Sequence, residues 1–195
     1  MVNDVNPPPD KEDLMTSDNN PVAVCTVENM GVNITGTDVE IVDGVSMELF
    51  PGEILSLVGE SGSGKTTSGT ALLGYARTGA TISAGSIRVA GRDIRSLSPT
   101  EVRKIRGLEI GYVPQDPSSA LNPAIRIGIQ LRELLDMHQM GTPEERDTWI
   151  RDILPEVGLP NDDEFLRRFP HQLSGGQVQR VAIAMMFLPK PKVLV

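Results

Sequence analysis

Long apolar runs are missing from this sequence, since no stretch reaches the roughly 18 consecutive apolar residues that a helix needs to span a bilayer. The N-terminus lacks the basic and then apolar pattern of a secretory signal peptide. An excess of positive charge is also missing, because the formal net charge is −8. Nonspecific nucleic-acid binding requires a basic surface. We therefore expect a protein that stays in the cytoplasm and has no nucleic-acid partner.

Cysteine occurs only once, at Cys25, so an internal disulfide is excluded. This residue lies in an apolar stretch, Pro21 to Val27, and the pattern predicts a small buried hydrophobe. The 195 residues are enough for one sizeable domain, or for one domain with a small insert. The 39% apolar and 23% charged content is typical of a soluble globular chain.

The N-terminal segment differs in character from the rest of the chain. Residues 1–21 contain five acidic residues against one lysine, which is a net charge of −4 out of the total of −8. The segment is also rich in proline and poor in apolar residues, so we expect a disordered acidic tail. A partner-docking arm is the alternative, but the segment contains no hydrophobic anchor.

Apolar periodicity predicts strands and then helices beyond this tail. Alternating apolar residues between positions 22 and 49, separated by glycines, predict short antiparallel strands with one covered face. The run Ile54–Val58 predicts a strand buried on both faces, as in a parallel sheet. Helical content follows from Lys65 to Ala76, with Tyr75 on its apolar side. Further strands are expected at 86–90 and 110–113.

Two capping boxes mark helix starts later in the chain. Ser98 with Glu101, and Thr142 with Glu145, each have a proline at the first helical position. Apolar residues recur at helical spacing from Asn122 to Arg168, and Gly158 is placed to end one of these helices. A mostly helical insert within an α/β protein is the economical interpretation.

Residues 59–67 match the phosphate-binding loop pattern of glycine, four residues, glycine, lysine and a hydroxyl residue. Glycines let successive backbone N–H groups converge on phosphate oxygens, and the following helix points its positive dipole end at the same anion. Lys65 would bridge the β- and γ-phosphates, and Thr66 would offer its hydroxyl to Mg²⁺. A chance match in a flexible loop is the alternative, and the predicted strand and helix on either side argue against it.

A second small-residue turn opens a later helix. The segment Leu173–Gln177, with the sequence Leu-Ser-Gly-Gly-Gln, precedes the apolar helix Val178–Ala184. The start of that helix is another potential anion site, and an ordinary N-cap at Ser174 is compatible with that role.

These two motifs, in this order, resemble those of the ATP-binding subunits of ABC transporters, with Gln115 at the place of the family's Q-loop glutamine. The resemblance covers residues 22–195. It implies an α/β fold with a RecA-like P-loop NTPase core, an N-terminal antiparallel β subdomain and a helical subdomain at about 116–175. By this resemblance the cofactors are ATP and Mg²⁺, with Thr66 and Gln115 at the metal. The implied ATP-binding residues are Gly59, Glu60, Ser61, Gly62, Ser63, Gly64, Lys65, Thr66, Thr67 and Gln115, and the signature residues Leu173, Ser174, Gly175, Gly176 and Gln177 face a partner's ATP.

Two finer segments are similar to the peptide and nickel importer subfamily, which includes oligopeptide and dipeptide importers. They are Gln115–Pro123 and Phe169–Gln172. This likeness implies an ABC-type ATPase that couples ATP hydrolysis to uptake of peptides or related solutes. It also implies work at the cytoplasmic face of the membrane, head-to-tail pairing with a second ATP-binding domain in a homo- or heterodimer, and contact with transmembrane permease subunits.

The sequence departs from the family pattern in two places. Asn33 aligns best with the aromatic residue that stacks on adenine, which weakens the expected preference for ATP over GTP. The segment Pro191–Val195 resembles the start of the Walker B strand, and the family's following aspartate, glutamate and later histidine are not among the 195 residues. His138 and His171 precede that position and are expected to be surface or packing residues.

From these departures we expect a core that is incomplete at the C-terminus, and a fragment that binds ATP with little turnover. A noncatalytic, truncated nucleotide-binding or interaction protein is the alternative. An ABC-type ATPase of DNA repair or translation would lack the Gln115–Pro123 segment, and the signature motif argues against a small-molecule kinase.

Overall fold

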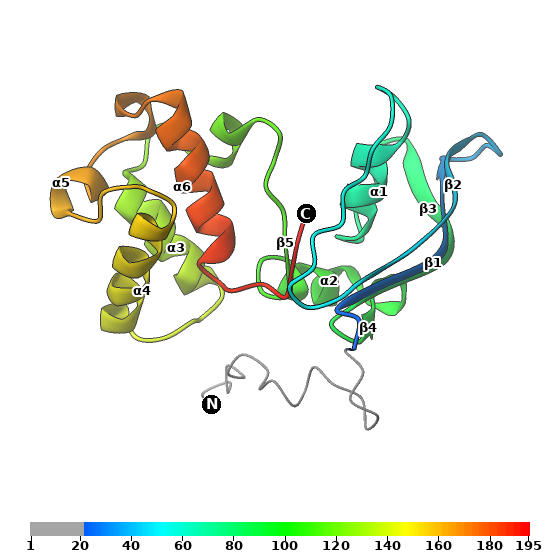
Figure 1. The fold of residues 1–195 in the computed structure, drawn as a ribbon, viewed down its shortest axis with the longest axis horizontal. Helices are drawn as coiled ribbons and strands as arrows, with labels where there is room; N and C mark the ends of the chain where they lie inside the picture. The colour runs from blue at the N-terminus through cyan, green and yellow to red at the C-terminus, as the bar shows by residue number, and fades with distance from the viewer. Residues whose placement is uncertain (1–21) are drawn as a thin grey trace. The chain divides into compact units, whose positions relative to one another are not determined.

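The computed structural model describes residues 22–195. The predicted disordered tail, residues 1–21, lies outside the described residues. The described residues fall into two compact units, residues 22–110 with Val195 and residues 111–194. Figure 1 labels the helices and strands of each unit.

The first unit is built on a four-stranded sheet in the order β2-β1-β3-β4. Its strands are β1 (Cys25–Ile34), β2 (Glu40–Leu49), β3 (Ala80–Val89) and β4 (Arg92–Asp93), and every neighbouring pair is antiparallel. The prediction of antiparallel strands is confirmed, and the strand expected at 86–90 is the second half of β3. Cys25 is buried, as predicted, and its burial raises the pKa of the thiol to about 11.

Helix α1 (Lys65–Ala71) is shorter than the predicted span of 65–76. Gly74 ends it, with φ of +63°, a conformation that glycine adopts without a Cβ penalty. The N–H of Tyr75 donates to the carbonyl of Thr70, and the N–H of Gly74 donates to the carbonyl of Ala71. This pair of bonds is the Schellman motif that closes helix C-termini. Tyr75 therefore lies beyond the helix and is 46% exposed.

The short helices η2 (Ile94–Ser96) and α2 (Pro99–Ile105) complete this unit. The predicted capping box is present at α2, where the Ser98 hydroxyl accepts from the N–H of Glu101 and the Glu101 carboxylate accepts from the N–H of Ser98. The Ser98 hydroxyl also donates to the Glu101 carboxylate, at 2.6 Å. This bond, together with the one from the Ser98 N–H, holds the pKa of the Glu101 carboxyl below its usual range.

The prediction of a doubly buried strand at Ile54–Val58 is wrong for this structure. These residues form no strand, and the side chains of Ile54 and Val58 are each 92% exposed. A β-strand is stabilised by backbone hydrogen bonds to its neighbours and by packing against the layers that cover its faces. Within residues 22–195 the segment is paired with no other strand. Its composition suits a buried strand, but composition alone does not supply the pairing partner.

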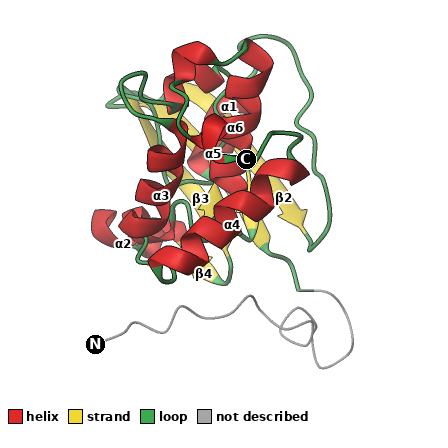
Figure 2. Ribbon diagram, turned by 90° about the vertical axis from the view of Figure 1, so that its left-hand side faces the viewer, coloured by secondary structure: helices red, strands yellow, loops and turns green. Residues whose placement is uncertain are grey.

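The second unit is mainly helical, as the red ribbons of Figure 2 show. Its α-helices are α3 (Ile127–Met137), α4 (Pro143–Glu156), α5 (Asp163–Leu166) and α6 (Gly175–Phe187), and its 3-10 turns are η3 (Pro117–Ala120) and η4 (Pro170–Gln172). Helix α3 packs against α4, α5 and α6. The side chains in the core of this helical unit are almost completely buried: Ile127, Leu131, Leu135, Ile150, Leu154, Phe165 and Val181. The expectation of apolar faces at helical spacing is confirmed.

Local signals fix the ends of α4. Thr142 and Glu145 form the predicted capping box at its start, and Gly158, with φ of +70°, follows its last turn. An ion pair then ties α4 to α3, with Arg132 Nε 2.5 Å from Asp147 Oδ1. The hydrogen bond from Arg132 lowers the pKa of the Asp147 carboxyl.

Two very short strands, β5 (Ile110–Gly111) and β6 (Val193–Leu194), pair with each other. β5 covers only the first half of the strand expected at 110–113. β6 lies within the segment that resembles the start of a Walker B strand. Among the helices of residues 22–195, none is long and apolar enough to cross a membrane.

Candidate nucleotide-binding site

Two glycines of the phosphate-loop sequence adopt conformations that other residues rarely take. Gly62 and Gly64 have φ of +84° and +85°, and Gly64 is the residue at the N-cap of α1. A Cβ on Gly64 would lie 2.9 Å from the carbonyl oxygen of Ile41 and 3.1 Å from a methyl of Val42. A side chain at this position would therefore disturb both the loop and the nearby residues of β2, Ile41 and Val42. The loop requires glycine here.

The ammonium group of Lys65 is directed into its own loop. Nζ donates to the carbonyl oxygens of Gly59, at 2.8 Å, and Glu60, and lies 3.4 Å from the hydroxyl of Ser63. An ammonium has three donors, and here all three are satisfied by uncharged loop atoms. A phosphate oxygen is a stronger, charge-assisted acceptor, so an arriving phosphate can replace these bonds with better ones.

The first turn of α1 supplies further donors. The first helical bond runs from the N–H of Ser68 to the carbonyl of Gly64, at 2.8 Å. The N–H groups of Lys65, Thr66 and Thr67 precede it and have no acceptor further back within the helix. Together with the helix dipole, they make this end of α1 attractive to an anion.

The chemistry of the loop also fits a magnesium ion that arrives with a nucleotide. Magnesium prefers hard oxygen ligands and usually binds through one or two protein groups plus phosphate oxygens and waters. Thr66 is exposed and carries such an oxygen. Within residues 22–195 there is no group of three or more His, Cys, Asp or Glu residues that could hold a metal ion. A metal in this part of the chain would therefore need ligands from the nucleotide.

The other predicted site residues lie in the helical unit. Gln115 is exposed and stands between β5 and η3. Ser174 is the N-cap of α6, with its hydroxyl accepting from the N–H of Gln177 at 3.3 Å, while Gln177 Oε1 accepts from the N–H of Ser174 at 3.0 Å. The sequence interpretation included the cap at Ser174 but missed that Gln177 completes a capping box, which the spacing of serine and glutamine could have indicated.

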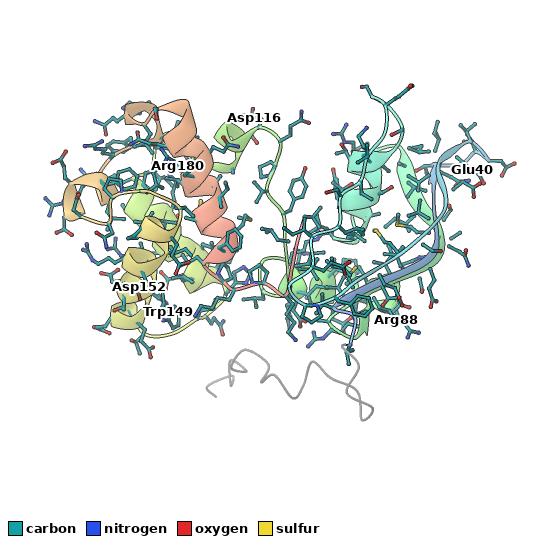
Figure 3. All side chains as sticks on the ribbon, in the orientation of Figure 1. Glu40, Arg88, Asp116, Trp149, Asp152 and Arg180 are labelled. Carbon is teal, nitrogen blue, oxygen red and sulfur yellow. The ribbon has the colours of Figure 1, made fainter. Side chains whose placement is uncertain are left out.

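The glycines of the signature segment face open space. A Cβ on Gly175 or Gly176 would meet no atom within 4 Å. The carbonyl of Gly176 accepts from Arg180 Nε, at 3.2 Å, one turn along α6, and Figure 3 labels Arg180 on that helix. The start of α6 is therefore ordered by its own cap and remains accessible on its outer side.

The structure thus brings residues 59–67 together in the sheet unit, and places Gln115 and the segment 173–177 in the helical unit. Asn33 lies near the end of β1, where its Oδ1 accepts from the Ser83 hydroxyl at 2.7 Å. The ring of His171 stacks on Phe169 with centroids 5.5 Å apart. Burial lowers the pKa of His138, a packing role that agrees with the sequence interpretation.

Comparison with known proteins identifies the family. The family model described as ABC transporter matches residues 42–195. The chain belongs to the ABC transporter family. It is 38% identical over 175 residues to the dipeptide transport ATP-binding protein DppD of Bacillus subtilis, an alignment that covers 88% of this chain and 52% of that protein. It is 37% identical over 167 residues to the oligopeptide transport ATP-binding protein OppD of the same organism, covering 82% and 45%.

Solved structures of ABC proteins support the same assignment at the level of fold. A dimeric post-hydrolysis state of the ATP-binding cassette MJ0796, bound to ADP and Pi, superposes with a TM-score of 0.72 at 27% identity. That alignment covers 87% of this chain and 72% of the cassette. The fold is therefore the α/β, P-loop NTPase fold of ABC ATPases, as the sequence predicted. The chain spans about half the length of the curated peptide-transport relatives named above.

Proposed function

We propose that this chain is the ATP-binding part of an ABC importer subunit, which couples ATP binding and hydrolysis to the uptake of peptides or related solutes. The observation that carries the proposal is the loop 59–67, whose glycines have φ values that suit a phosphate cradle and whose lysine ammonium sits inside it. Relatives named for dipeptide and oligopeptide transport support the class of solute.

In this proposal the loop holds the triphosphate of ATP. Lys65 exchanges its bonds to loop carbonyls for bonds to the β- and γ-phosphates, and the N–H groups at the start of α1 bind the same oxygens. Thr66 and Gln115 would hold Mg²⁺, which would neutralise charge on the phosphates. Several charge-assisted hydrogen bonds of about 1.5–3 kcal/mol each are enough for micromolar affinity, about −8 kcal/mol.

Two such chains, or this chain and a related one, would pair head to tail at the cytoplasmic face of the membrane. Each loop 59–67 would then face the partner's segment 173–177, so that Lys65 and Ser174 of one chain act on different nucleotides. The open space around Gly175 and Gly176 suits a ligand that approaches from outside the chain. Permease subunits would sense closure of the dimer through Gln115 and the helical unit.

A binding assay with a fluorescent ATP analogue tests the role of Lys65. Lys65→Met removes the ammonium but keeps the length of the side chain, and we expect affinity to fall about 10- to 100-fold, the loss of one or more charge-assisted bonds. Lys104→Met is the matched control, because Lys104 is an exposed lysine of α2 in the same unit but outside the loop. Equal affinities for the two variants would refute the proposed loop.

Turnover is a separate question for the polypeptide of residues 1–195. Positioned acid–base chemistry contributes about 10²–10⁴-fold to such reactions. The aspartate and glutamate implied by the family resemblance are not among these residues. We expect ATP binding with little phosphate release in a steady-state assay, and turnover comparable to that of a full-length relative would contradict this expectation.

A further inference from the structure

Outside the phosphate loop, the sheet unit contains a pocket of about 480 Å³ between η2, α2 and the end of the α1 turn. Three arginines and several aliphatic side chains line it. We call it the arginine pocket, and its main lining residues are Ile94, Leu97, Val102, Arg95, Arg103 and Arg106.

The apolar part of the arginine pocket is preformed. Ile94 and Val102 are only 2% and 8% exposed, so they are fixed within the core of the unit. The backbone at Gly74 lies close to both side chains, since a Cβ there would be 2.7 Å from a methyl of Ile94. The aliphatic side chains at the base of the pocket are therefore fixed before a ligand arrives, and a preorganised site loses less entropy on binding.

Two of the three guanidinium groups are held in place by backbone carbonyls. Arg106 donates from Nε to the carbonyl of Leu73, at 2.8 Å, and from Nη2 to that of Gly74, at 3.2 Å. Arg95 donates to the carbonyls of Gly85 and Ser83. A guanidinium has five N–H donors in a planar fork, so each of these arginines keeps donors beyond those that position it.

The arginines of the pocket are not ion-paired with carboxylates. None of its three arginines takes part in the ion pairs found among residues 22–195, and no aspartate or glutamate lines it. The acidic residues nearest in sequence accept hydrogen bonds from uncharged groups. Asp93 accepts from the backbone N–H of Arg95 at 3.0 Å, and Glu101 accepts from the hydroxyl of Ser98 at 2.6 Å.

We propose that the arginine pocket binds a small organic carboxylate that carries an apolar body. Guanidinium groups bind carboxylates through short, charge-assisted and often bidentate hydrogen bonds. Buried aliphatic walls beside them favour the apolar remainder of such a ligand. The volume falls within the range of about 300–1,000 Å³ that is usual for small-molecule sites. The proposal is independent of the nucleotide site, whose residues do not line this pocket.

Calorimetric titration with an isosteric pair of bicyclic probes tests the proposal. The full 195-residue chain is titrated with 2-naphthoate and with uncharged 2-naphthamide, both in saturating Mg-ATP so that the phosphate loop cannot take up the carboxylate. We expect the naphthoate to bind at least tenfold more tightly than the amide, since a charge-assisted bond is worth about 1.5–3 kcal/mol. Equal affinities, or no heat from naphthoate up to millimolar concentrations, would overturn the proposal.

A pair of arginine variants locates the binding. Arg103 is exposed on α2, and its Nε makes one long bond, 3.4 Å, to the carbonyl of Pro99, so Arg103→Gln should leave the fold intact. We expect this variant to lose about tenfold in affinity for naphthoate. Arg88→Gln is the control, because Arg88, labelled in Figure 3, is an exposed arginine of β3 that does not line the pocket, and this variant should bind like the unsubstituted chain. Unchanged binding by Arg103→Gln, with ATP affinity intact as the check on folding, would place the carboxylate elsewhere and refute the proposal.

Discussion

Asn33 is the residue that the family resemblance aligns with an aromatic side chain expected to stack on adenine. Its amide oxygen is held by the Ser83 hydroxyl at 2.7 Å, so a polar group stands where the resemblance implies an aromatic ring. An amide presents no extended π-face to a purine. If the proposed function is right, the chain should therefore hold ATP and GTP mainly by their shared triphosphate and separate them only weakly.

Asn33→Tyr should raise the affinity for both nucleotides about tenfold, because stacking of a base on an aromatic side chain is worth about 1–3 kcal/mol. Competition against a fluorescent ATP analogue measures both affinities. Thr26→Tyr, at the opposite end of β1, is the control and should leave them unchanged. A ring at position 33 that has no effect would mean that the base lies elsewhere.

Single residues of the loop show what sequence can and cannot predict. The pattern predicted where backbone freedom is needed, and Gly62 and Gly64 do adopt positive φ. It did not predict that Lys65 would bond to the carbonyls of its own loop, because those bonds depend on how the loop folds back on itself. The spacing of a motif specifies residue types. The contacts that the Lys65 ammonium makes depend on the three-dimensional geometry of the loop.

At the scale of elements, helix starts are the best-predicted feature of this chain. Thr142→Ala should lower the free energy of unfolding of the helical unit by about 1 kcal/mol, since it removes an N-cap acceptor and breaks the capping box with Glu145. Urea denaturation followed by circular dichroism measures the change.

Thr148 offers the matched control for this substitution. It is an exposed threonine in the interior of the same helix, and its hydroxyl bonds only to the carbonyl of Glu144, one turn back. Thr148→Ala should be neutral or slightly stabilising, because alanine has the higher helix propensity. If both variants lost the same stability, the loss at position 142 would not come from its capping role.

Strands were predicted less well than helices, and the reason lies in the range of the interactions. A capping box is closed by residues three positions apart, so both partners are visible in one short stretch of sequence. A strand depends on a neighbour that can lie far along the chain, as Cys25 of β1 pairs with Val89 of β3. The segment Ile54–Val58 has strand-like composition, but the structure of residues 22–195 gives it no such neighbour.

At the scale of the whole molecule, the exposed apolar segment Ile54–Val58 predicts how the chain behaves in solution. Ile54, Leu55, Leu57 and Val58 are all at least 42% exposed, within five consecutive residues. Soluble proteins rarely expose such a cluster, and contiguous exposed apolar side chains favour association with another molecule. We therefore expect the 195-residue chain to self-associate through this segment at micromolar concentrations.

Ile54→Lys should reduce that association, because it replaces an exposed apolar side chain with a charged one that opposes aggregation. Ile54 is 92% exposed, so the substitution removes little packing from the folded chain. Val39→Lys is the control, since Val39 is also exposed, at 56%, but lies outside the segment. Sedimentation velocity over a range of concentrations should show a smaller increase in mass for Ile54→Lys than for Val39→Lys. If both variants showed the same increase in mass, the association would arise from another surface. The segment 54–58 would then not be the site of self-association.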